Sequence, residues 1–114
     1  IKGQDGIMVQ PATDTNYDMR RAARHRANHV AIAESKRHGE QKMHIVNVSA
    51  HGFMIDDNSV FEHGDRIEIR LPVVGRIEAH LIWTVESRAG FQFERVIRLP
   101  DFMALIEKVA PKLR

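Results

Sequence analysis

The sequence contains no cysteine, no long apolar run and almost no net charge. The absence of cysteine excludes disulfides, thiolate nucleophiles and every zinc site that needs sulfur. No apolar stretch approaches the roughly 18 residues of a membrane-spanning helix, and the N-terminus lacks the apolar core of a signal peptide. We therefore expect a soluble, cytoplasmic protein without membrane insertion, in which any metal site would use histidine and carboxylate ligands.

The 17 Lys and Arg residues exceed the 15 Asp and Glu residues by only two, which is too little for a general polyanion binder. The distribution is more informative, because residues 20–26 hold four arginines and no acid. This concentration favours a local anion site over a basic surface. A chain of 114 residues corresponds to one domain with its own core.

The first 18 residues differ in character from the rest of the chain. They are polar and show neither a helical nor a strand period, so we expect residues 1–18 to form a flexible arm. Because Met8 opens a stretch that resembles a natural start, we expect residues 1–7 to be foreign to the natural protein. Residues 19–114 then form the folded domain. Its opening segment, residues 20–29, fits either a short helix or an extended lead-in.

Six short segments between residues 28 and 95 have the β-branched content or two-residue alternation of strands, and turn residues separate them. In the first, Val30 and Ile32 alternate with small residues. The clearest hairpin joins residues 77–85 to residues 91–94. Its alternation places Trp83 on the apolar face with its neighbours, so we expect Trp83 to pack in the core, with stacking on a planar ligand as the alternative. Six strands without intervening helices indicate an antiparallel barrel or sandwich.

The C-terminal segment changes period. Apolar residues recur at i, i+3, i+4 and i+7 from Phe102 to Val109, and Pro100 suits a first helical turn. The pattern predicts an amphipathic α-helix that ends near Pro111. Its apolar stripe must be buried, and the open end or outer wall of the barrel is the available partner.

The arginine cluster contains a pair with four-residue spacing, Arg20 and Arg24, with Arg21 and Arg26 beside it. A guanidinium is permanently charged, and its fork of donors matches phosphate oxygens or the O6/N7 edge of guanine. Two such groups can hold one compact anion from one side. The alternative is a solvated basic lead-in before the first strand.

A second motif, residues 47–52, reads Asn-Val-Ser-Ala-His-Gly. In an extended chain Asn47 and Ser49 point to the same face and present donors and acceptors together. Gly52 allows a positive φ or a close approach of ligand to the backbone. The alternative is a simple turn, for which these residue types are typical. We expect His51 to face solvent.

The pattern Arg20-x-x-x-Arg24 followed by Asn47-x-Ser49-x-x-Gly52 resembles that of the PilZ domain family. Residues 76–94 are similar to the family's closing hairpin, and a C-terminal helix follows. The resemblance covers about residues 19–110.

This resemblance implies a six-stranded antiparallel β-barrel with a C-terminal helix that binds cyclic di-GMP, a bacterial second messenger, and signals to a protein partner in trans. The ligand-binding residues that it implies are Arg20, Arg21, Arg24, Asn47, Ser49 and Gly52. Met19, just before the first arginine, slightly favours one bound ligand over a stacked pair. Because the arginines lie in the lead-in, ligand binding would order the arm against the barrel.

Catalytic and metal motifs are missing. The sequence has no Ser-His-Asp order and no glycine-rich phosphate loop followed by lysine, so we expect no enzymatic activity. His25 and His29 have the spacing of metal ligands on a helix but no supporting carboxylates nearby, and we expect neither a metal nor another cofactor. We expect the carboxylates that flank turns to be solvated or to cap backbone groups; they are Asp56, Asp57, Glu62 and Asp65.

Two other functions remain open from the residues alone. One is a protein-interaction adaptor with the same fold and no ligand. The other is a barrel that binds nucleic acid through residues 20–26, although a single Trp and a single Tyr leave little aromatic surface to stack bases.

Overall fold

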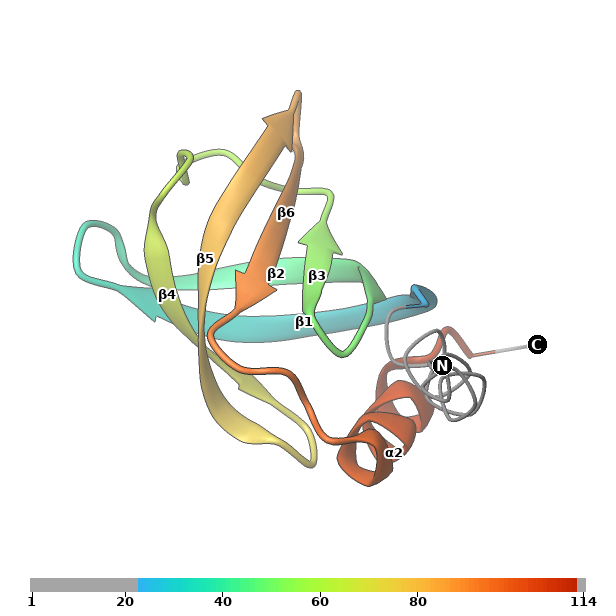
Figure 1. The fold of residues 1–114 in the computed structure, drawn as a ribbon. Helices are drawn as coiled ribbons and strands as arrows, with labels where there is room; N and C mark the ends of the chain where they lie inside the picture. Colours follow the sequence, from blue (N-terminus) through green and yellow to red (C-terminus); the bar gives the residue numbers. More distant parts are fainter. Residues whose placement is uncertain (1–22, 113–114) are drawn as a thin grey trace, which may run out of the picture.

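The computed structural model describes residues 23–112, which form six β-strands and one helix. The strands close into an antiparallel barrel in the order β1-β2-β3-β6-β5-β4 (Figure 1). The expected six-stranded barrel is thereby confirmed over the sandwich. The arm, residues 1–18, and both Arg20 and Arg21 lie outside the described residues. The elements are β1 (His25–Ser35), β2 (Gly39–Val48), β3 (Gly52–Ile55), β4 (Arg66–Leu71), β5 (Gly75–Val85), β6 (Arg88–Phe93) and α2 (Leu99–Val109).

Alternate residues of each strand point into the barrel and build its core. Phe53 of β3 and Phe91 of β6 are register partners whose rings stack at 5.0 Å between centroids. In β1 the small residues Ala31 and Ala33 are buried, whereas Val30 is 58% exposed. The interior beside β1 is thus filled by the larger side chains of the facing strands.

Three β-bulges interrupt this alternation near one side of the barrel. They lie between Arg26 and His29 in β1, between Ile45 and Asn47 in β2, and between Leu81 and Trp83 in β5. A bulge adds one residue to one strand and turns every later side chain to the opposite face. The expectation that Trp83 packs in the core is therefore wrong: Leu81 is buried, and the extra residue turns Trp83 to the outer face, where it is half-buried.

Helix α2 packs its apolar face beside the start of β1, next to the β2–β3 turn (Figure 1). Phe102, Leu105 and Val109 are buried in the same hydrophobic cluster as the barrel interior, and the ring of His25 contacts Phe102 edge-on at 5.4 Å. The predicted amphipathic helix is confirmed, with Pro100 in its first turn. Within residues 23–112, no helix is long and apolar enough to cross a membrane.

A buried carboxylate fixes the tip of the β1–β2 hairpin to the loop before β4. Asp65 accepts hydrogen bonds from the backbone N–H of Glu62 and from the guanidinium of Arg37, each at 2.8 Å. Burial alone would raise the pKa of Asp65. The hydrogen bonds from Glu62 and Arg37, together with the positive charges of Arg37 and His38, outweigh burial and hold that pKa below its ordinary value. Asp65 is thus a capping residue, as expected, but a buried one.

Candidate ligand-binding site

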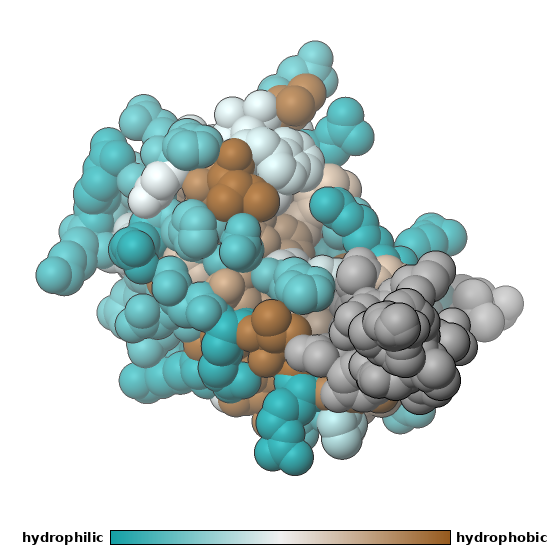
Figure 2. Space-filling view, viewed as in Figure 1, coloured by the Kyte–Doolittle hydropathy of each residue, from teal (hydrophilic) through white to brown (hydrophobic). Residues whose placement is uncertain are grey.

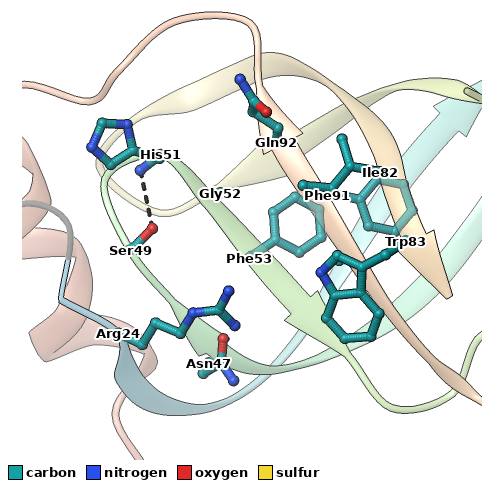
Figure 3. Close-up of a pocket in the computed structure, with 11 residues that line it drawn as sticks. Arg24, Asn47, Ser49, His51, Gly52, Phe53, Ile82, Trp83, Phe91 and Gln92 are labelled. Carbon is teal, nitrogen blue, oxygen red and sulfur yellow. Dashed lines mark hydrogen bonds between the residues drawn. The ribbon is translucent and has the colours of Figure 1, made fainter. Parts of the chain in front are cut away.

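The two sequence motifs meet in one hollow on the outer wall of the barrel. Arg24 from the lead-in to β1, Asn47 from β2, Ser49 from the turn after β2 and Gly52 from the start of β3 line a hollow of about 120 Å³ (Figure 3). Segments that are 23 residues apart in the sequence therefore present their polar side chains to one place. The rest of the lining comes from His51 and Phe53 and, on the two neighbouring strands, from Ile82, Trp83, Gly90, Phe91 and Gln92.

The strand register explains how Asn47 and Trp83 come to share one face of the barrel. The pairs Arg26–Asn47, Asn47–Met54, Met54–Gly90 and Gly90–Trp83 form one continuous row across β1, β2, β3, β6 and β5. Residues paired in this way share a face, so the row runs across the outer wall. It has Arg26 at one end and Trp83 at the other, and its path along the curved wall is about 19 Å at the usual spacing between strands.

Two glycines shape the hollow between these ends. A Cβ atom on Gly90 would overlap the indole of Trp83, so the ring lies where a side chain of β6 would stand. A Cβ atom on Gly52 would overlap the backbone carbonyl of Phe91. Gly52 does not adopt the positive φ that we considered; instead, it allows β3 and β6 to approach closely.

The turn that carries Ser49 is held by backbone hydrogen bonds. Ser49 N–H donates to the Gly52 carbonyl at 2.8 Å, and the His51 carbonyl accepts from Phe93 N–H at 2.8 Å. The Ala50 carbonyl accepts from Ile97 N–H at 2.9 Å, which connects the turn to the segment leading to α2. The Ser49 hydroxyl oxygen accepts from His51 N–H at 3.1 Å, and its own proton remains free to rotate toward a ligand.

The charge of the hollow is positive. Among the described residues that line it, Arg24 carries the permanent charge and none is acidic, and His51 stands exposed at the rim as expected. Figure 3 shows the Arg24 guanidinium beside the Asn47 side chain, on the opposite side from Trp83. Asn47 directs one amide N–H at the sulfur of Met54 at 3.7 Å, a weak acceptor. The arrangement suits an anion that also carries a planar, hydrogen-bonding group.

Apolar surface continues from the hollow along β5. Ile82 is 39% exposed and Val85 is 50% exposed, and hydrophobic atoms stand out along this strand toward the tip of the β5–β6 hairpin (Figure 2). Trp83 lies between them in the sequence. This side of the hollow therefore offers an aromatic and aliphatic surface, in contrast to the polar Arg24 side.

The other candidates do not form comparable sites. A larger hollow of about 710 Å³ lies between β1 and β4, but its lining mixes charges of both signs and contains no motif residue. His25 and His29 lie on a strand, and burial lowers the pKa of His29. Within residues 23–112, no group of three or more His, Asp or Glu side chains is arranged to hold a metal ion.

Sequence reasoning missed the contribution of the β5–β6 hairpin to this hollow. Strand alternation favours the core for Trp83 over the alternative of stacking on a ligand, and no role for Ile82, Gly90 or Gln92 follows from the sequence. The available signal was Gly90, because a glycine inside a strand often marks a bulge or the close approach of another group.

The comparisons agree with this architecture. A family model described as PilZ domain matches residues 18–110, and the chain belongs to the PilZ family. Among solved structures, the chain is similar to the crystal structure of the PilZ domain of CeSA from a cellulose-synthesizing bacterium, with a TM-score of 0.54 and 14% sequence identity. That similarity covers 77% of this chain and 95% of the other, and it shows a shared fold. A search of curated protein sequences finds no match.

Proposed function

We propose that this domain is a non-catalytic receptor for cyclic di-GMP. The observation that carries the proposal is the convergence of Arg24, Asn47, Ser49 and Gly52 in one hollow that also holds Trp83. The four residues other than Trp83 belong to the two motifs through which the sequence resembles ligand-binding PilZ domains.

The chemistry of the hollow fits that ligand. Cyclic di-GMP carries two phosphates and two guanines. Arg24 supplies a fork of donors for a phosphate or for the O6/N7 edge of guanine. The Asn47 and Ser49 side chains supply short donors and acceptors for a base edge. Trp83 supplies a ring face or edge for a base, and such contacts commonly contribute about 1–3 kcal/mol per base.

The size of the hollow supports a role for the N-terminal segment. A volume of about 120 Å³ holds on the order of four water molecules, far less than a cyclic dinucleotide. We propose that the ligand rests on the barrel wall and that the lead-in, with Arg20 and Arg21, closes over it. Ordering of the lead-in would then change the surface offered to a protein partner. A cytoplasmic location is part of this proposal.

Matched variants test ligand binding. Ser49→Ala should weaken the binding of cyclic di-GMP about tenfold, because it removes a hydrogen bond to a charged or strongly polar group. Ser87→Ala, on the exposed β5–β6 turn, should bind like the unsubstituted protein. Equal affinity of the Ser49 and Ser87 variants, both folded, would remove Ser49 from the site. No binding by the unsubstituted protein would leave the adaptor function as the better account.

Amide hydrogen exchange tests the change in the arm. With saturating cyclic di-GMP, residues 10–28 should exchange more slowly than in the free protein, while amides of β4 should be unaffected. Unchanged exchange of residues 10–28 at saturation would refute the closing of the lead-in and leave the binding site itself standing.

A further inference from the structure

A second arginine stands beside the hollow without belonging to its lining. Arg26 is exposed, and its register partner is Asn47, which does line the hollow. Paired residues share a face, so the Arg26 side chain projects from the same outer wall as Asn47. Arg24 lies two residues earlier, at the lead-in to the same strand. Residues spaced by two point to one face and lie about 6–7 Å apart at their Cα atoms.

The neighbouring residues confirm this alternation. His25 contacts Phe102 of α2, and Ala27 is buried, so both point inward. A bulge lies between Arg26 and His29, and it shifts the pairing of β1 with β2 by one residue. The register that pairs Arg26 with Asn47 therefore applies only to the start of β1. The bulge therefore helps to place Arg26 opposite Asn47, which lines the hollow.

Some of the other arginines of the barrel have carboxylate partners, although no salt bridge within residues 23–112 involves Arg70 or Arg88. Arg37 pairs with Asp65 and Arg66 pairs with Glu94, each at 2.8 Å. Within residues 23–112, neither Arg24 nor Arg26 forms a salt bridge. Two guanidinium groups without carboxylate partners in the described part of the chain thus stand together at one end of the site.

We infer that Arg26 is a further ligand residue and that Arg24 and Arg26 together select a ligand with two phosphates. This inference rests on the proposed function. Two cations on one strand face match two phosphodiester charges better than one, and each guanidinium offers a bidentate fork to a phosphate. A cyclic mononucleotide, with one phosphate, can use only one of the two. Arg26 thereby extends the site from the hollow onto β1.

The test compares Arg26→Gln and Arg26→Lys with Arg70→Gln by calorimetric titration. Arg70 is a matched control, because it is an exposed strand arginine beside another arginine, Arg76, away from the hollow. We expect Arg26→Gln to weaken binding of cyclic di-GMP about tenfold and Arg26→Lys to weaken it less, since lysine keeps the charge and loses the fork. The binding of cyclic GMP should change less than twofold, and thermal unfolding should match that of the Arg70 variant.

The salt dependence of binding distinguishes a direct contact between Arg26 and a phosphate from an indirect effect of the substitution. The affinity ratio between the unsubstituted protein and Arg26→Gln should shrink as salt rises from about 0.05 M to about 0.5 M, because exposed charges are screened over shorter distances. If Arg26→Gln binds cyclic di-GMP as tightly as the unsubstituted protein, the inference is wrong and the proposed function stands. If the unsubstituted, folded protein does not bind at all, both are wrong.

Discussion

Replacing Gly90 with alanine should move the indole of Trp83 out of the ligand hollow. Gly90 and Trp83 are register partners on β6 and β5, and the indole covers the place where a Cβ atom on residue 90 would stand. The new methyl group cannot share that space, so the ring must rotate to another orientation. The buried neighbours Leu81 and Phe91 point to the opposite face and keep their positions.

The expected loss of binding free energy follows from the contact that the indole would make with a guanine base. Loss of a base–aromatic contact costs about 1–3 kcal/mol of binding free energy, or about 5- to 150-fold in the dissociation constant of cyclic di-GMP. The free energy of unfolding should change by a smaller amount. A half-buried ring forced from its preferred rotamer costs about 0.5–1.5 kcal/mol, and no core contact is broken.

Fluorescence provides the assay, because Trp83 is the single tryptophan of the chain. The Gly90→Ala protein should show red-shifted emission, weaker ligand binding and an unfolding temperature lowered by no more than about 10 °C. A double-mutant cycle supplies the control: in a Trp83→Ala background, Gly90→Ala should have no further effect on binding. Unchanged emission and affinity in Gly90→Ala, or an equal loss in the Trp83→Ala background, would refute the assignment of Trp83 to the site.

Four further substitutions test the fold and its separation from the site. Arg24→Ala should change the free energy of unfolding by less than about 0.5 kcal/mol, measured by denaturant titration, because the side chain is exposed. Gly52→Ala should destabilise by on the order of 2 kcal/mol or more, since its Cβ would meet the Phe91 carbonyl; an unchanged midpoint would contradict the close approach of β3 and β6. Phe102→Ala should cost about 3–5 kcal/mol, and a small loss would show that α2 is not part of the core. Asp65→Asn should cost about 1–3 kcal/mol at neutral pH. Because the folded protein holds the pKa of Asp65 below the ordinary 3.8, its stabilisation is present above that pH and is lost as the pH falls through the folded-state pKa, so unfolding of the Asn variant should depend less on pH there.

The residues alone predict an antiparallel barrel or sandwich, the family resemblance favours the barrel, and the structure confirms the barrel. Alternation and turn chemistry predict the number of strands, because each strand has one buried face. Asn47 and Ser49 are separated by one residue in an extended segment, so their shared face also follows from the sequence. The structure places both in the hollow with Arg24.

The apolar half of the site could not be predicted in the same way. A bulge between Leu81 and Trp83 reverses the alternation of inward and outward side chains in β5. The sequence of β5 itself does not show where the extra residue of a bulge lies. The partnership of Trp83 with Gly90 depends on the register of two strands. The burial of Asp65 likewise depends on Arg37, which is 28 residues away in the sequence.

Isothermal titration calorimetry tests the central claim most directly. Cyclic di-GMP, GTP and cyclic GMP are each titrated into the full chain, and then cyclic di-GMP into Arg24→Ala and Ser49→Ala. The account predicts binding of cyclic di-GMP at about micromolar affinity or tighter, much weaker binding of the two mononucleotides, and binding weakened about tenfold or more in both variants while they remain folded. No heat of binding with folded, unsubstituted protein would contradict it.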